Sequence, residues 1–474
     1  LTYTQFELID NAAASPLIPV VVNAGANANN AVADAFRIVQ NGLNLEFYLD
    51  GTLISTHVLD AVNDVDVNGS GDDDTLTVDY SGGVFTLPSV IAFSGNGHTS
   101  GDTLIITGGA PTSATHNLTG TGTGNIDIGS DASADITYDT LEQTNSSGSA
   151  IATLILNLPA NVTDATVADS GANNDGANQI TSTSSAFTAS IFGNPATTFE
   201  VNATGGSSVI QLSAMDNGFG PTNINLTGQA GDEFDTTAAE VIPDVSTVTL
   251  TAATLDLNGN NETLGALAGT GPVTLGAGNL TTGGNGGSTS YSGAISGTGS
   301  VTKDGVGTWT LDGTGVNSFS GGTFASDGTL LLSRTGGGVS IPGDLTVGDG
   351  IGGNDSAIVR LTQPNQIADT SAVSMNADGL LNLDGNPETI ASLTSLDNGT
   401  EVALGAATGI LTVSSGDFGG VISGSGDLIK ETAGTLILSG TNTYTGSTSV
   451  NGGTLTVNGS IATSSGVGVA SGAT

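Results

Sequence analysis

The sequence predicts an all-β chain folded as a parallel β-helix (a β-solenoid) in the form of a rod. Three observations predict this class. Short segments with two or three apolar residues at alternating positions are separated by Gly, Asn or Asp, as in "SVTKDG", "TWTLDG" and "GTLLLS". Strong helix formers are scarce, since Lys and Arg together number only 5 in 474 residues. A long pattern also occurs twice, which is typical of solenoids.

The repeated pattern occupies the second half of the chain. Lys303 and Lys430, the only two lysines, stand at matching points of "SGTGSVTKDGVGTWTLDGTG" and "SGSGDLIKETAGTLILSGTN". Upstream, residues 255–271 match residues 381–399. The chain therefore contains two copies of a module of about 125 residues, the second incomplete. Because no strand is long enough to make a stable hairpin alone, we expect rungs of about 20–25 residues that stack in parallel.

This module resembles the autotransporter-associated β-strand repeat, which occurs in passenger regions of large bacterial surface proteins. The resemblance covers about residues 250–474 and rests on the two segments quoted above. It implies a solenoid that is extracellular or on the bacterial cell surface. It also implies that both lysines occupy the usual lysine position of the repeat. We therefore expect each lysine to have a structural role, lying along a rung and meeting a carbonyl or a neighbouring acid.

Acidic repeats precede this module. The segments "VNGSGDDDTLTVDYSGG", "FSGNGHTSGDTLIITGG" and "LTGQAGDEFDTT" resemble repeats of very large extracellular bacterial proteins, related to calcium-binding RTX nonapeptides. In such repeats, glycine permits a tight turn and aspartate lends a carboxylate to Ca²⁺ between adjacent turns. The resemblance implies calcium as a cofactor, with Asp73, Asp74 and Asp102 as candidate metal ligands. The alternative is that these acids are solvated turn residues, because the motifs lie about 30 residues apart rather than in consecutive turns.

The N-terminal part differs from both kinds of repeat. Apolar and polar residues alternate across Asn41-Gly42 and Asp50-Gly51. Both dipeptides favour type I′ turns, so we expect an antiparallel meander. A short helix over "NNAVADAFRIVQ" is the alternative.

Three regions follow from these patterns. Residues 1–66 form an N-terminal meander or cap, residues 67–240 an acidic RTX-like solenoid, and residues 241–474 the autotransporter-type solenoid. We expect the boundary in "VIPDVSTVTL" because proline cannot donate to a strand ladder.

Composition excludes several classes of function. With 5 Lys+Arg against 45 Asp+Glu, the formal charge is −40, and nucleic acid is a poor partner because phosphate binding needs a basic surface. No run of about 18 apolar residues occurs, so we expect no transmembrane helix. The chain has no cysteine and must be stabilised without disulfides.

An enzyme is a less favoured class. Some parallel β-helices are polysaccharide lyases or hydrolases, and such sites need a positioned acid or base. The arginines are far apart, no G-x-S-x-G occurs, and the 45 acids offer no preferred pair for glycoside hydrolysis. The three histidines, His57, His98 and His116, lack a metal-binding spacing. We therefore name no catalytic and no cofactor-binding residue.

The function expected from the sequence is mechanical. We interpret the chain as a non-enzymatic structural segment of an extracellular or cell-surface fibre, which continues in a longer chain or self-associates end to end into filaments. The alternative is the stalk of an adhesin or autotransporter passenger, with glycan or cell-surface contacts. A polysaccharide-active enzyme is the third hypothesis.

Overall fold

A computed structural model describes residues 17–24, 33–96, 101–129, 133–395 and 397–474. The described residues are almost entirely β-strands and turns, with two short 3₁₀ turns, η1 (Leu59–Ala61) and η2 (Tyr80–Gly82). The chain divides into two compact units. Unit 1 comprises Leu1–Asn157 with Gln179–Gly193, and unit 2 comprises Leu158–Asn178 with Asn194–Thr474. The expected all-β fold is confirmed.

Unit 1 consists of two sheets built mainly from parallel neighbours. The strands of its first sheet are β1 (Ile18–Asn23), β5 (Val62–Asn68), β7 (Ile91–Ser94), β9 (Ser113–Gly120), β10 (Thr123–Ile128) and β11 (Ile136–Asp139). Those of its second sheet are β2 (Ala35–Asn41), β3 (Asn44–Leu49), β4 (Thr52–Val58), β6 (Thr75–Asp79), β8 (Thr103–Thr107), β12 (Gln143–Gly148) and β16 (Ala189–Gly193). Strands β13 (Thr153–Ala160) and β15 (Ala177–Ser182) contain the limits of the units.

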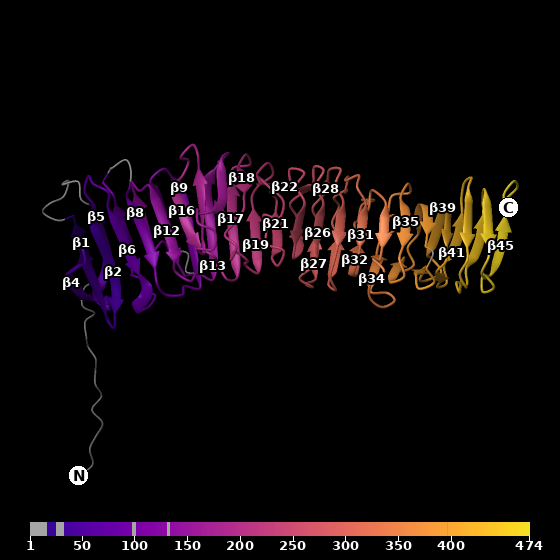
Figure 1. Cartoon of the computed structure of the whole chain (residues 1–474), viewed down its shortest axis with the longest axis horizontal. Helices are drawn as coiled ribbons and strands as arrows, with labels where there is room; N and C mark the ends of the chain where they lie inside the picture. The colour runs from indigo at the N-terminus through magenta and orange to yellow at the C-terminus, as the bar shows by residue number, and fades with distance from the viewer. Residues whose placement is uncertain (1–16, 25–32, 97–100, 130–132, 396) are drawn as a thin grey trace, which may run out of the picture. The chain divides into compact units, whose positions relative to one another are not determined.

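Unit 2 has three sheets of parallel strands (Figure 1). The first contains β17 (Thr198–Thr204), β19 (Asn223–Thr227), β21 (Thr247–Thr251), β24 (Ala266–Gly269), β27 (Thr289–Tyr291), β30 (Thr308–Leu311), β32 (Gly328–Leu332), β34 (Ala357–Leu361), β36 (Gly379–Asn382), β38 (Glu401–Ala403) and β40 (Val421–Ser423). The second contains β14 (Ala165–Asp169), β18 (Val209–Leu212), β20 (Glu233–Thr236), β22 (Thr254–Asp256), β25 (Val273–Thr274) and β28 (Ile295–Ser296).

The third sheet begins at β23 (Glu262–Leu264) and continues with β26 (Leu280–Thr282), β29 (Val301–Lys303), β31 (Thr323–Ala325), β33 (Leu345–Val347), β35 (Ala372–Met375), β37 (Glu388–Thr394), β39 (Ile410–Phe418), β41 (Asp427–Lys430), β43 (Ser447–Val450) and β45 (Gly466–Val469). Strands β42 (Thr435–Leu438) and β44 (Thr454–Val457) pair beside the second half of β39. Because the chain visits the sheets in turn and each strand pairs in parallel with its equivalent one rung later, the expected parallel β-helix is confirmed.

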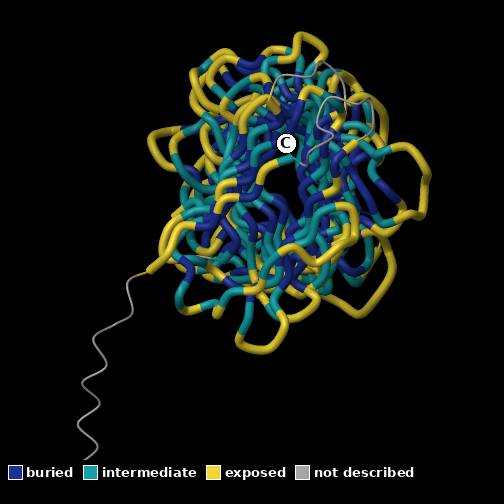
Figure 2. The backbone as a smooth tube through the Cα atoms, turned by 90° about the vertical axis from the view of Figure 1, so that its left-hand side faces the viewer, coloured by how far each residue is buried: buried dark blue, intermediate teal, exposed yellow. Residues whose placement is uncertain are grey.

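The interior consists of side chains stacked from rung to rung. Alternate residues of most strands are buried, as the period of a strand requires, and many turns between strands are exposed (Figure 2). Burying each large aliphatic side chain contributes about 1.5–3 kcal/mol. One column in unit 2 shows the arrangement and runs through consecutive register partners, namely Trp309, Leu330, Val359, Leu381, Val402 and Ile422.

Repeated glycines mark the places where rungs approach most closely. A Cβ built on Gly299 would overlap the carbonyl oxygen of Gly278, and one on Gly426 would overlap that of Gly409. Gly299 and Gly426 are equivalent in the two modules. A side chain at either position would force the rungs apart, which explains why glycine recurs there.

The antiparallel meander is confirmed, with one correction to its turns. Strands β2, β3 and β4 pair antiparallel in sequence order. Asp50 and Gly51 both have positive φ, 49° and 74°, as a type I′ turn requires. The other turn was predicted at Asn41-Gly42, but Asn41 still pairs with Asn44, so the turn lies at Gly42 and Leu43. Only Gly42 has positive φ there, which fits type II′.

Candidate functional site

The two lysines make the same contacts in the two modules. Lys303 ends β29, and its Nζ donates to the carbonyls of Asp304 (2.9 Å), Gly305 (2.6 Å) and Asp327 (3.1 Å). Lys430 ends β41, and its Nζ donates to two carbonyls of its own turn at 2.8 and 3.0 Å and to Gly452 of the following rung at 3.0 Å. An ammonium has three donors, so each is fully used.

Both lysine side chains are 0% exposed. Burial lowers the pKa of Lys303 to about 8, and it lowers the pKa of Lys430 as well. The buried cation joins its own turn to the turn of the next rung. The expected carbonyl contact is therefore present at both positions, and no substrate could reach either amine.

A second repeated pair, Asn317 and Asn442, also joins neighbouring rungs. Asn317 Oδ1 accepts the N–H of Ile295 at 3.0 Å, and its Nδ2 donates to the carbonyl of Ser340 at 2.8 Å. Asn442 repeats both contacts, with Ile422 at 2.9 Å in the preceding rung and a carbonyl of the following rung at 3.1 Å. Each side-chain amide therefore takes the place of a backbone amide, because it hydrogen-bonds the backbone of the rung before and the rung after where no strand pairing occurs.

Arg334 is the other buried cation of unit 2. Its side chain is 1% exposed, and burial lowers its pKa. The guanidinium donates at 2.7 to 3.5 Å to the carbonyls of Ser292, Gly293, Asp312 and Gly315 and to Oδ1 of Asn317. These acceptors occupy both terminal nitrogens, and Nε is buried without a hydrogen-bond partner, so the guanidinium presents no donor to an anionic ligand from solvent.

A repeated pair of buried acids completes this set. Glu262 and Glu388 are each 1% exposed and stand in the matching segments "NNET" and "NPET". The carboxylate of Glu262 accepts the N–H groups of Ile242 (2.9 Å) and Val241 (3.3 Å) from the preceding rung. Glu388 accepts from Gln366 at 2.8 Å in the same way. Burial raises the pKa of Glu262 to about 8 and that of Glu388 to about 7.

Two of the three candidate metal ligands of unit 1, Asp74 and Asp102, belong to a ladder of acids. Asp74 Oδ1 accepts the N–H of Asp34 at 3.1 Å, Asp102 Oδ1 accepts the N–H of Asp74 at 2.7 Å, and Glu142 Oε2 accepts the N–H of Asp102 at 2.9 Å. Asp74 and Asp102 are 0% exposed, whereas Asp73 is exposed. The motifs stack in consecutive rungs because the rungs here are longer, with 28 residues between Asp74 and Asp102. Their assignment to calcium stays a prediction.

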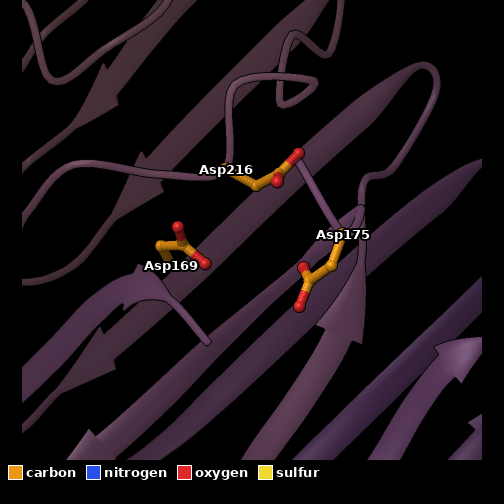
Figure 3. Close-up of side chains that lie close together, drawn as sticks. All are labelled: Asp169, Asp175 and Asp216. Carbon is orange, nitrogen blue, oxygen red and sulfur yellow. The ribbon is translucent and has the colours of Figure 1, made fainter. Parts of the chain in front are cut away.

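Two groups of three acids converge in unit 2. In the first, carboxylate oxygens of Asp169, Asp175 and Asp216 lie within 4.8 Å of one another (Figure 3). Asp216 accepts from the Asn194 amide at 2.9 Å and from the N–H groups of Gly218, Asn174 and Gly176 at 2.6 to 3.4 Å. The Asn194 amide and these N–H groups lower the pKa of Asp216. With four donors, its in-plane lone pairs are occupied, which leaves little capacity for a metal.

The second group lies on the outer side of neighbouring strands β20 and β22. Oxygens of Glu233, Asp235 and Asp256 lie within 4.8 Å of one another, and Asp235 and Asp256 are register partners. Burial, together with the charges of Glu233 and Asp256, raises the pKa of Asp235 to about 6. Its Oδ1 is shielded from solvent and has no hydrogen-bond partner. Like charges held this close are costly unless a proton or a cation neutralises them.

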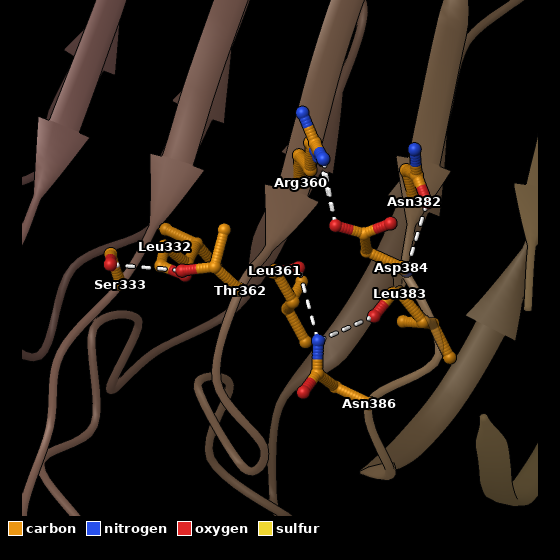
Figure 4. A network of polar contacts seen from close by, with 9 residues as sticks. All are labelled: Leu332, Ser333, Arg360, Leu361, Thr362, Asn382, Leu383, Asp384 and Asn386. Atoms are coloured by element: carbon orange, nitrogen blue, oxygen red, sulfur yellow. Dashed lines mark hydrogen bonds and ion pairs between the residues drawn. The ribbon is translucent and has the colours of Figure 1, made fainter. Parts of the chain in front are cut away.

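The exposed face carries ordinary turn chemistry. Arg360 forms an ion pair with Asp384 at 2.7 Å, and both side chains are more than 40% exposed (Figure 4). Beside it, the Asn386 amide donates to the carbonyls of Leu383 (3.0 Å) and Leu361 (3.2 Å). An exposed ion pair contributes at most about 1 kcal/mol. This network therefore orders the turns, and most of the stability comes from the buried core.

The histidines do not form an accessible reactive site among the described residues. In unit 1, His116 Nδ1 lies 3.0 Å from Ser190 Oγ, and Thr144 Oγ1 donates to the same Oγ at 2.9 Å. His116 is 1% exposed and Ser190 0%, and burial lowers the pKa of His116 to about 4. A histidine and a serine in contact could form a nucleophilic pair, but this one is sealed in the core. His57 packs edge-on against Phe47, and His98 lies outside the described residues.

Comparison with known proteins identifies the repeated segments. A family model described as passenger-associated-transport-repeat matches residues 301–332 and 428–457. The chain carries two passenger-associated-transport-repeats. The predicted autotransporter-associated β-strand repeat is confirmed at these segments, and the repeat points to the passenger region of an autotransporter. No curated protein and no solved structure matches the chain. Among the described residues, no helix is long and apolar enough to cross a membrane.

The transport repeats coincide with the buried polar contacts. Each matched segment begins at or next to the strand that carries the lysine, and each includes one of the two repeated asparagines. The glutamates lie outside the matched segments and were not predicted from the sequence. The signal was available, because "NNET" and "NPET" occupy the same place in the two matching segments 255–271 and 381–399. The quoted segment "LTGQAGDEFDTT" contains Glu233 and Asp235, but no pattern indicated the third member, Asp256, because it comes from the next rung.

Proposed function

We propose that this chain is a non-enzymatic structural segment of an extracellular or cell-surface fibre. One observation carries the proposal: the polar side chains that are repeated between the modules form hydrogen bonds to backbone groups of their own and neighbouring rungs. Lys303 and Lys430 donate to three carbonyls each, and Asn317 and Asn442 bridge rungs on both sides. A repeat that preserved a catalytic or ligand site would present its polar groups to solvent.

Stacked rungs suit a mechanical role. Each rung hydrogen-bonds its neighbours along whole strands, so load along the stack is shared by many parallel bonds. The role includes self-association or continuation in a longer chain. Among the described residues β45 pairs with β43, and Val467 and Val469 on it are 54% and 55% exposed. In either form of the proposed role, the other edge of β45 is the place where the next strand would add, whether from the same chain or from another copy.

The alternative is the stalk of an autotransporter passenger or adhesin. The transport repeats favour it, since their description refers to passengers. In this alternative the segment holds a binding tip away from the cell and does not form filaments itself. An extracellular or cell-surface location suits both functions.

Electron microscopy of the negatively stained, purified 474-residue chain distinguishes a self-associating fibre segment from a stalk. A fibre segment gives long filaments whose length grows with protein concentration, and the double variant Val467→Lys, Val469→Lys gives short particles. The matched control Val306→Lys changes a 76% exposed valine in a turn and keeps the filaments. Uniform short particles at every concentration, in the wild type as in the edge variant, would reject self-association and leave either continuation in a longer chain or the stalk.

The proposal includes calcium as a cofactor that stabilises the stack. The three acids Glu233, Asp235 and Asp256 offer the hard oxygen ligands that Ca²⁺ prefers. A bound cation would also neutralise the repulsion among them. Electron microscopy with and without chelator tests it, because fraying of the stack only under chelator is the expected result and an unchanged stack would reject a calcium role.

A further inference from the structure

Two interruptions of regular stacking meet in unit 1. Strand β10 is an extra strand that pairs antiparallel with both β9 and β11. Strand β15 stands next to β16 in its sheet, and the turn 183–188 joins the two. The turn before β10 contacts this second turn, because Thr121 Oγ1 donates to the carbonyl of Ser185 and the Thr188 N–H donates to the carbonyl of Gly120 at 3.2 Å.

A cleft lies where these turns meet. Its volume is about 430 Å³, within the range of ordinary small-molecule sites. Insertions in repeat proteins map to loops, often on the binding face. The lining comes from the two turns and from the segment between β11 and β12, with Thr121, Gly122, Thr140, Leu141, Glu142, Ser182, Ser185, Phe187, Thr188 and Ala189.

The lining combines hydroxyls with an apolar base. Five of its side chains carry a hydroxyl that can both donate and accept. Leu141 and Phe187 are 2% and 3% exposed and form the apolar part. Glu142 is the single charged group, and no lysine, arginine or histidine lines the cleft. In a chain of net charge −40, an anionic ligand would be repelled.

We propose that this cleft binds a neutral sugar residue, such as the end of an uncharged glycan. A sugar ring matches the lining because its hydroxyls donate and accept, as Ser and Thr do, while the nearly buried Phe187 and Leu141 close the base of the cleft against water. Glu142 would accept from a sugar hydroxyl with the oxygen that does not hold Asp102. The inference goes beyond a structural role, and it stands whether the chain is a fibre or a stalk.

A hollow in unit 2 provides the matched control. It has a similar volume, about 420 Å³, and is lined by Ser374, Met375, Asn376, Thr394, Ser395, Asp397 and Asp417. It holds two carboxylates and no aromatic ring, and it lies on regular rungs. A sugar should therefore distinguish the two hollows, although both are rich in polar groups.

Saturation-transfer NMR on the whole chain tests the proposal. The probes are the methyl glycosides of glucose, galactose, mannose and N-acetylglucosamine, with calcium chloride as a cationic competitor. Thr121→Trp and Thr140→Trp each place an indole in the mouth of the cleft from an exposed position, and Ser374→Trp does the same at the control hollow. Circular dichroism establishes that each variant is folded, and two independent blocking variants guard against the loss of one.

The expected result is transfer to at least one sugar in the wild type and in Ser374→Trp, weakened at least about tenfold in the two blocking variants. Calcium should leave the signal unchanged. The proposal is overturned if no glycoside receives saturation, if binding survives both blocking variants, or if calcium displaces the sugar by occupying Glu142. Binding that is lost equally in Ser374→Trp would also overturn it, because the sugar would then not be specific for this cleft.

Discussion

Replacing Glu262 with glutamine should remove a loss of stability that unit 2 of the wild type undergoes as the pH rises. The carboxyl of Glu262 is 1% exposed, and its pKa rises from the ordinary 4.5 to about 8 because of burial. Between these two values, the folded chain keeps a proton that the unfolded chain has lost. The free energy of unfolding therefore falls as the pH rises. At 1.36 kcal/mol per pKa unit, the fall amounts to about 4–5 kcal/mol once the pH exceeds 8.

Glu262→Gln removes this titration and keeps an oxygen that can accept from Ile242. We expect the variant and the wild type to be about equally stable at pH 5, and the variant to be more stable by several kcal/mol at pH 9. The assay is urea unfolding followed by circular dichroism from pH 5 to pH 9. The difference between the two proteins isolates Glu262 from the repulsion among the other acids, which also grows with pH.

Two further variants sharpen the test. Glu388→Gln should show a smaller gain, about 3–4 kcal/mol, that is complete about one pH unit lower, since the pKa of Glu388 rises from 4.5 to about 7. Glu431→Gln alters an acid whose contact with Asn451 is exposed, and it should follow the wild type. If Glu262→Gln were less stable than the wild type at pH 9, the two N–H contacts of the carboxylate would outweigh its burial, and the reasoning would be wrong.

The remaining predictions concern the other buried groups and the acid cluster. Lys303→Met and Lys430→Met should each cost about 3 kcal/mol, because three carbonyls lose their donor, and differential scanning calorimetry should show equal losses in the two modules. Arg334→Ala should cost at least as much in the same measurement, and a loss below about 1 kcal/mol would mean that water replaces the guanidinium. Trp309→Leu, which copies the residue of the second module, should cost about 2–3 kcal/mol in urea unfolding, since it leaves a cavity and removes one of the two donors to the carbonyl of Leu267. Calcium should raise the melting temperature of the wild type but not of Asp235→Asn, and an equal rise in both would place the ion elsewhere.

The sequence was sufficient for those features that depend on periodicity. Alternating apolar residues and the repeated lysines predicted the parallel stacking and the carbonyl contacts of Lys303, but not its burial. The turn at Asp50-Gly51 was predicted correctly because both residues favour positive φ. The turn at Asn41-Gly42 was misplaced by one residue because a glycine can serve in either central position, and pairing with Asn44 decides which.

Features that depend on which rungs are neighbours could not be predicted. The step from Asp74 to Asp102 looked too long for stacking, since nothing in the sequence reveals that rungs in unit 1 are longer than those in unit 2. The cleft at Thr121 and Ser185 arises because two insertions, 64 residues apart, end at the same place. Loop closure of that kind is invisible to any local pattern.

The disposition of the cations has a practical consequence for anyone who handles the protein. All five lysines and arginines lie in the described part of the chain, and Lys303, Lys430 and Arg334 are at most 1% exposed. The other two, Arg37 and Arg360, are held in ion pairs within strands. Amine-directed dyes and cross-linkers should therefore leave the lysine side chains of the native protein unmodified, and trypsin should find few bonds to cut. Labelling of Lys303 or Lys430 would itself report that a rung has opened.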